Sequence, residues 1–124
     1  MDVEGQNADR VILTRNFENS LELYPYDKWL NFEQRVRELP QFDPNVQRIK
    51  KVLVAGAVEV SLDSHGRILV PQPMRQFAGL EREVTWVGQL DTVQLWAKNR
   101  WSEAVDQALD NPEDLQAAAA EFGL

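Results

Sequence analysis

Residues 57–80, with the sequence AVEVSLDSHGRILVPQPMRQFAGL, constrain the fold more than any other stretch of this chain. The segment VEVSL alternates apolar with polar side chains, which is the period of a strand with one buried face. The run DSHG that follows is a turn signal. The segment ILV then predicts a second short buried strand, which Pro71 ends because proline has no N–H to donate to a ladder. We therefore predict a short helix after Pro71, and before it a β-hairpin whose tip carries Asp63, Ser64, His65 and Arg67.

The composition is that of a soluble globular domain. The 124 residues, of which 44% are hydrophobic and 27% charged, are enough for about one domain. The chain has no cysteine and a single histidine, which excludes disulfides and argues against a zinc site, so no cofactor is implied. No apolar run approaches the ~20 residues that span a bilayer, and we expect a cytoplasmic protein without membrane contact.

The formal charge of −7 argues against nucleic acid as a partner, because lysine and arginine make most phosphate contacts. The charges are unevenly distributed along the chain. Residues 35–82 include eight basic and five acidic residues, whereas the residues after Arg100 include six acidic residues and no basic one. The acidity therefore belongs mostly to the C-terminal end, and the central segment remains compatible with DNA.

The other segments alternate between predicted hairpins and predicted helices. Residues 11–13 and 21–23 form the strands of one expected hairpin, and residues 84–87 and 93–96 form those of another. Helices are expected from Pro25-Tyr26, from Asp43-Pro44 to Gly56, over 72–78 with Gly79 at the end, from Lys98 to Leu109, and more weakly over 115–122. The first should place Trp29, Phe32, Val36 and Leu39 in the core, and the second Val46, Ile49, Val52 and Leu53. This pattern indicates an α+β fold.

An offset of 72 residues lays one part of the chain on another. It aligns Ile12 with Val84, Leu21 with Val93, Leu23 with Leu95, Tyr24 with Trp96 and Trp29 with Trp101. We interpret the chain as two tandem β-rich units with packing helices. The divisions are a disordered N-terminus at 1–9, a partial first unit at 10–55, a second unit at 56–109, and an acidic tail or weak helix at 110–124.

The first unit is expected to be N-terminally incomplete, because a counterpart of residues 63–67 would fall before Met1. A late start assignment, a fragment or a natural deletion would each explain this. Hairpin edges at residues 11–14 or 21–24 should then lack strand partners, and unpaired edges invite another chain.

The hairpin tip suggests a catalytic cluster, which the rest of the sequence does not support. Asp63, Ser64 and His65 are neighbours on a tight turn, and no second histidine, orienting carboxylate or oxyanion hole stands at a distinctive spacing. We therefore expect no enzymatic activity. The same residues also have a structural interpretation. In it, Asp63 caps the turn, Gly66 supplies a positive φ angle and Arg67 pairs with an acidic side chain. Arginine is also a planar, bidentate donor suited to phosphate and to guanine.

The pattern D-x-x-G-R-x-x-x-P-x-x-x-R resembles the motif of AbrB-type swapped-hairpin DNA-binding domains, and it is filled by Asp63, Gly66, Arg67, Pro71 and Arg75. With VLVAGAVEV before it and FAGL and VGQLDTVQLW after it, the chain is most similar to the MraZ family, from about Arg10 to Val105. The resemblance implies two AbrB-like units of the double-split β-α-β type. Members of the family carry two such motifs, whereas this sequence contains one.

The resemblance further implies a function. A protein of this kind is a sequence-specific transcriptional regulator, a repressor, that binds promoter DNA of the bacterial division and cell-wall gene cluster as a ring-shaped homo-oligomer and is associated with the nucleoid. It would assign DNA contact to Arg67 and Arg75, with His65 and Ser64 as lesser candidates. A basic helical face at Arg48, Lys50 and Lys51 is a further candidate. Self-association also fits the apolar surface expected from Trp29, Trp86, Trp96 and Trp101.

Two other functions stay open at this point. One is an AbrB-fold antitoxin or protein-interaction module, which would use the acidic residues between Glu103 and Glu121 to occupy a partner protein. The other is a structural oligomer that does not bind DNA.

Overall fold

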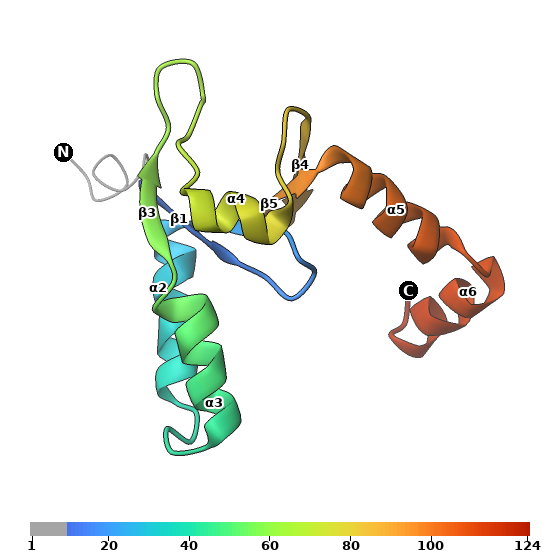
Figure 1. Cartoon of the computed structure of the whole chain (residues 1–124). Coiled ribbons are helices and arrows are strands. Elements are labelled where there is room, and N and C mark those ends of the chain that lie inside the picture. The colour runs from blue at the N-terminus through green and yellow to red at the C-terminus, as the bar shows by residue number, and fades with distance from the viewer. Residues whose placement is uncertain (1–9) are drawn as a thin grey trace.

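The computed structural model describes residues 10–124, so the disordered N-terminus predicted for residues 1–9 lies outside the described residues. Within that range the chain has the predicted α+β fold, built on an antiparallel sheet in the order β3-β1-β2-β5-β4 (Figure 1). The strands are β1 (Arg10–Arg15), β2 (Leu21–Pro25), β3 (Val58–Ser61), β4 (Val84–Gln89) and β5 (Thr92–Ala97). The helices are α2 (Tyr26–Arg37), α3 (Pro44–Ile49), the π-helix η1 (Lys50–Val54), α4 (Gln72–Ala78), α5 (Lys98–Leu109) and α6 (Pro112–Glu121). The hairpins predicted at residues 11–23 and 84–96 and the helix from Lys98 to Leu109 are confirmed, while the tandem AbrB-like arrangement stays a prediction.

The two hairpins join at the centre of the sheet, where β2 pairs with β5. Leu21 faces Leu95, and Glu22 faces Gln94, the residue 72 positions after it. The Gln94 side chain donates a hydrogen bond of 3.0 Å to Oε1 of Glu22. Equivalent positions of the sequence offset thus meet across the β2–β5 pair. Two copies of one unit related by a two-fold axis would give this pairing.

Aromatic pairs follow the same relation on the other face of the sheet. Tyr24 and Trp29 meet edge to face with ring centroids 5.4 Å apart, and their counterparts Trp96 and Trp101 do so at 5.3 Å. Each pair fixes the helix that follows a hairpin to the last strand of that hairpin. Trp29 and Trp96 are buried by these contacts, so the prediction that they supply free apolar surface was wrong, whereas Trp86 is 47% exposed.

The offset needs one correction in the first strand of each hairpin. Val11 faces Pro25 in the first hairpin, and Val84 faces Ala97, the residue 72 positions after Pro25, in the second. Val84 therefore matches Val11, and the predicted match with Ile12 is wrong by one position. The reason is that five residues separate the paired Arg15 and Leu21 in the first hairpin, whereas four separate the equivalent pair Gly88 and Val93 in the second, which shifts β1 relative to β4 by one position.

The strand edges predicted at residues 11–14 and 21–24 are not free. β1 pairs with β3 along its second edge, and β2 pairs with β5, so both strands lie inside the sheet. β3 comes from the segment that leads into the hairpin tip, and it completes the sheet beside the N-terminal hairpin. The outer strands of the described sheet are β3 and β4. The prediction failed because a strand more than 40 residues along the chain fills the edge.

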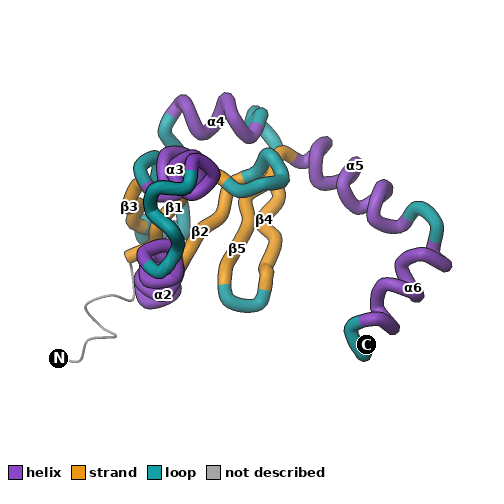
Figure 2. Tube along the Cα trace, turned by 90° about the horizontal axis from the view of Figure 1, so that it is seen from below, coloured by secondary structure: helices purple, strands orange, loops and turns teal. Residues whose placement is uncertain are grey.

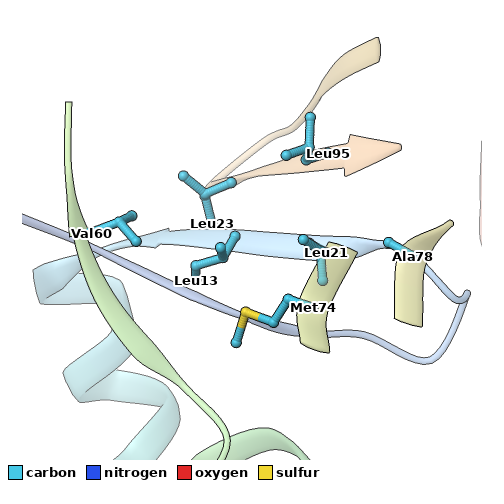
Figure 3. Close-up of a cluster of buried hydrophobic side chains, with 7 residues drawn as sticks. All are labelled: Leu13, Leu21, Leu23, Val60, Met74, Ala78 and Leu95. Atoms are coloured by element: carbon cyan, nitrogen blue, oxygen red, sulfur yellow. The ribbon is translucent and has the colours of Figure 1, made fainter. Parts of the chain in front are cut away.

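Helix α4 covers one face of the sheet and closes the main core. Figure 3 shows its side chains Met74 and Ala78 against leucines of β1, β2 and β5. This core cluster consists of Leu13, Leu21, Leu23, Val60, Met74, Ala78 and Leu95, each 9% exposed or less. Gly79 ends α4 in the left-handed region at φ 65°, as the sequence predicted. Burial of each large side chain contributes about 1.5–3 kcal/mol to this packing, so α4 is firmly held.

The second strand predicted for the hairpin tip is absent. Residues 68–70 have no ladder partner, and Leu69 is 82% exposed. Ile68 and Val70 still pack against the core cluster, whereas Leu69, which was also predicted to be buried, does not. The ladder fails because these two side chains draw the segment onto the core beside α4, and Pro71 begins that helix at once.

Helices α2, α3 and η1 form a helical lobe, residues 26–54, on the face of the sheet opposite α4 (Figure 2). Asp43 caps α3 through a 2.8 Å bond from the Asn45 N–H. Trp29, Val36, Val46 and Leu53 are buried as predicted. Leu39 is 40% exposed because α2 ends before it, and Val52 is 44% exposed because the wider π-helical turn rotates it outward.

Helices α5 and α6 form a C-terminal arm, residues 98–124, that extends away from the sheet (Figures 1 and 2). No residue of either helix is buried. The segment predicted as a weak helix or tail is helical over residues 112–121, and the Asn111 side chain caps it. None of the described helices is both long enough and apolar enough to cross a membrane.

We predict that Gly79→Ala destabilises the protein by about 1–2 kcal/mol, because an L side chain is strained at a φ of 65°. The added Cβ would also lie 2.7 Å from an Arg100 nitrogen, and Arg100 bonds the carbonyls of Phe77 and Asn19. Gly88→Ala is the matched control, since a Cβ added at Gly88 would meet no atom within 4 Å and the residue has no positive φ. Urea unfolding measures both variants, and equal stabilities would contradict the prediction.

Candidate nucleic-acid interface

The segment 62–71, called the motif loop below, projects from the body between β3 and α4 (Figure 1). Its tip is a closed turn. The Asp63 N–H donates to the Arg67 carbonyl at 2.9 Å, and the Gly66 N–H donates to the Asp63 carbonyl at 3.0 Å. Gly66 has a φ of 74°, a conformation that costs glycine little and other residues more. The loop is therefore a defined turn although its tip is exposed.

The Asp63 carboxylate organises this turn from inside. Its Oδ1 accepts the backbone N–H groups of His65 and Arg67, each at 2.8 Å, and its Oδ2 accepts Nε of Arg67 at 2.9 Å. The backbone bond from Arg67 lowers the pKa of Asp63 most, and the His65 N–H and the Arg67 side chain lower it further. The carboxylate is thus ionised at neutral pH and holds both the backbone and the arginine.

The Arg67 guanidinium is bonded at Nε and exposed at its two terminal nitrogens. The ion pair with Asp63 uses Nε, while the Arg67 side chain is 73% exposed. Both terminal nitrogens therefore stay available to a ligand. A guanidinium fixed in this way offers two parallel donors to a phosphate or to a guanine edge.

Ser64 and His65 share the exposed tip with Arg67. The Ser64 hydroxyl lies 3.3 Å from Nδ1 of His65, and both residues are exposed. The geometry brings these two side chains together as polar groups that could donate or accept at a ligand. It provides them with no buried neighbour that would activate a nucleophile.

Arg75 lies on α4, one residue after the buried Met74, and is exposed. Its guanidinium makes no hydrogen bond or ion pair with any part of the chain that the structure describes. Pro71 joins the motif loop directly to α4, so the loop and Arg75 belong to one element that the core anchors. The four predicted DNA-binding residues thus lie on one continuous exposed segment, and their contact with DNA stays a prediction.

Two arginines that position this segment have no local sequence signal. Arg10 bonds Glu59 at 2.8 Å, which ties β1 to β3, and its guanidinium lies 3.7 Å from the centre of the Tyr26 ring. Arg100 donates to the Phe77 carbonyl at 3.1 Å and so holds the end of α4. The partners of these arginines are 49 and 23 residues away in the sequence, which no spacing pattern reveals.

Comparison with known proteins places this arrangement in a family. A family model described as "MraZ protein, putative antitoxin-like" matches residues 53–122, which include the motif loop and α4. A protein named "Transcriptional regulator MraZ" from Acetivibrio thermocellus is 34% identical over 117 residues, 94% of this chain and 82% of that protein. The chain belongs to the MraZ family.

Other relatives in the MraZ family carry the same name. The protein from Thiobacillus denitrificans is 39% identical over 102 residues, which cover 82% of this chain and 69% of that protein. The one from Thermoanaerobacter pseudethanolicus is 34% identical over 99 residues, 80% of this chain and 69% of that protein. The family resemblance drawn from the residues of the motif is thus confirmed.

We predict that Asp63 keeps a lowered pKa when the arginine side chain is removed. Arg67→Ala retains the backbone N–H that is the largest cause of the shift, so the Asp63 pKa should rise only part of the way to its usual value. Glu59 is the matched comparison, because the Arg10 side chain is the largest cause of its lowered pKa, and Arg10→Ala should remove most of that shift. Carboxyl-carbon NMR titrations measure both groups.

Protonation of Asp63 should weaken the turn. Because the folded pKa lies below the unfolded one, the ionised carboxylate stabilises the turn above the unfolded pKa of about 3.9. That contribution is lost as the pH falls through the folded pKa. A complete return of the Asp63 pKa to its usual value in Arg67→Ala would contradict the backbone-held turn.

Proposed function

We propose that this member of the MraZ family is a sequence-specific transcriptional regulator that binds promoter DNA through its motif loop and α4. Arg67 and Arg75 make the principal contacts, and His65 and Ser64 add lesser ones. Asp63 and Gly66 form the turn and do not read DNA. The protein acts in the cytoplasm at the nucleoid, without a cofactor and without catalytic activity.

The observation that carries this proposal is how the two arginines are positioned and exposed. Arg67 is fixed at Nε by Asp63 while its end is exposed, and Arg75 is exposed on a helix that the core holds. Because the Arg67 side chain is already oriented and the helix that carries Arg75 is already fixed, less conformational entropy is lost when they meet a ligand. The relatives named as transcriptional regulators add support from a separate source.

The net charge of −7 is compatible with this function because the acids near the motif are engaged. Glu59 pairs with Arg10, and Asp63 pairs with Arg67. Six acids lie beyond Arg100, on the C-terminal arm that extends away from the motif loop (Figure 1). Screening at physiological salt acts over about 8 Å, so that distant acidity does little to repel DNA from the loop.

One motif loop is too small a surface for tight binding. Specific protein–DNA interfaces bury roughly 1,000 Å² or more and neutralise several phosphates. A homo-oligomer that presents several loops to repeated promoter sites gains affinity through effective concentration. We therefore include in the proposal a ring of identical subunits that represses the division and cell-wall gene cluster, as the family resemblance implies.

A protein-interaction module is the second candidate function. The observation in its favour is the C-terminal arm, which carries six acids after Arg100, no base there and no buried residue. In this role the arm would occupy a partner protein, and the motif loop would have no DNA contact. The binding experiment below separates the two functions.

We predict that Arg67→Ala with Arg75→Ala lowers affinity for the promoter of the chain's own gene cluster by at least about tenfold, because a single bidentate arginine contributes ~1–3 kcal/mol. Fluorescence anisotropy over a salt series measures the affinity, and the slope against salt should become shallower. Arg82→Ala with Lys98→Ala is the matched control, which removes two exposed charges outside the motif. It should bind nearly as the native chain does.

Equal losses of DNA affinity in the two double variants would mean that the total positive charge of the protein, and not the motif, drives binding. Absence of specific binding by the native chain, together with recovery of a stoichiometric protein partner on its arm, would favour the interaction module.

A further inference from the structure

The helical lobe contains an apolar pocket that the described chain leaves open. It lies between α2, η1 and the β1–β2 turn, has a volume of about 410 Å³, and is lined by Phe17, Phe32, Leu39, Ile49 and Leu53. Phe17 is 80% exposed at its rim and Leu39 is 40% exposed. Contiguous apolar surface of this kind on a soluble protein marks a contact site.

The C-terminal arm presents a complementary apolar stripe. Leu115 and Phe122 stand seven residues apart at α6, so they share one face of the helix, and they are 51% and 78% exposed. Small alanines lie between them, which lets a partner approach closely. Asp114 and Glu121 repeat the same spacing one position earlier and flank the stripe with negative charge.

The charges of the two surfaces are opposite. The arm from residue 101 onward has six acids and no base. The pocket wall carries Arg35 and also Glu38. Residues 26–54 as a whole carry six basic side chains against four acidic ones, a net charge of +2; the basic ones are Lys28, Arg35, Arg37, Arg48, Lys50 and Lys51, and the acidic ones are Asp27, Glu33, Glu38 and Asp43. Opposite charges around an apolar centre favour association and fix its orientation.

We propose that the arm of one copy of this chain docks in the lobe pocket of the next copy. Leu115 and Phe122 enter the pocket, and Asp114 and Glu121 face Arg35 and its basic neighbours. The arm and the lobe lie at opposite ends of the molecule, so the chain's own arm does not reach its own pocket in this arrangement (Figures 1 and 2). This inference rests on the self-association proposed above and identifies the surfaces through which the copies would associate.

The contact has a geometric consequence. Each copy offers one arm and one pocket, which are different surfaces, so each copy touches two neighbours in a head-to-tail manner. Head-to-tail contacts close into rings when the rotation between neighbours allows it. Neither surface includes the motif loop, so the proposed contact uses no residue that the DNA proposal needs.

Two single variants of the full chain test the contact by sedimentation velocity in the absence of DNA. Phe122→Asp damages the arm, and Phe17→Asp damages the pocket; both side chains are so exposed that the fold should tolerate the change, which circular dichroism checks. We expect the native chain to sediment as an oligomer and both variants as monomers. Leu90→Asp, which alters a fully exposed residue outside both surfaces, should keep the native mass.

Mixing the two variants distinguishes this contact from a symmetric one. An equimolar mixture holds one intact arm on the Phe17→Asp chain and one intact pocket on the Phe122→Asp chain. A head-to-tail contact therefore gives a dimer with one copy of each. A symmetric arm-to-arm or lobe-to-lobe contact gives no such dimer.

A charge exchange keeps the test decisive if either aspartate variant fails to fold. Asp114→Arg with Glu121→Arg should reduce the oligomer to monomers, and adding Arg35→Glu to the same chain should restore part of the assembly. Salt should weaken the native oligomer as it screens these pairs.

A monomeric native chain, an unchanged mass in either aspartate variant, or a mixture without the mixed dimer would each overturn the inference. Because the mass is measured without DNA, such a failure leaves the DNA contact of the motif loop to be decided by the anisotropy experiment.

Discussion

Pairing of β2 with β5 is the interaction on which the rest of the structure depends. It joins two hairpins into one sheet, and the aligned faces of Leu21 and Leu95 then form a continuous apolar floor. Helix α4 lies on that floor through Met74 and Ala78. Without the pair, the second hairpin would be an isolated two-stranded ribbon, which is marginally stable in water, and the core beneath α4 would lose Leu95.

The path from this core to function runs through α4. Because Pro71 connects the motif loop to a helix held by the core, the C-terminal end of the loop has a fixed position. Asp63 then orders its tip with three hydrogen bonds, and one of them orients the Arg67 side chain. Arg100 holds the far end of the same helix. An exposed segment can in this way present Arg67 with an oriented guanidinium, and Arg75 on a helix of fixed position, before DNA is bound.

The sequence predicted those parts whose cause is local. The two-residue period marked both hairpins, Gly79 marked the end of α4, and the Asp63 motif marked the turn and the family. It missed what depends on distant chain: the pairing of β3 with β1, and the positioning roles of Arg10 and Arg100. Residues 68–70 show why a short apolar run is not enough, since Ile68 and Val70 pack against the core without any ladder while Leu69 is exposed.

Hydrogen–deuterium exchange of the full chain, measured with and without a duplex of its own promoter, tests the central claim most directly. If the motif loop and α4 contact DNA, amides in residues 63–76 exchange more slowly in the complex, while those of the helical lobe and the C-terminal arm are unchanged. Slower exchange confined to the lobe or the arm, with residues 63–76 unaffected in a bound complex, would contradict the account.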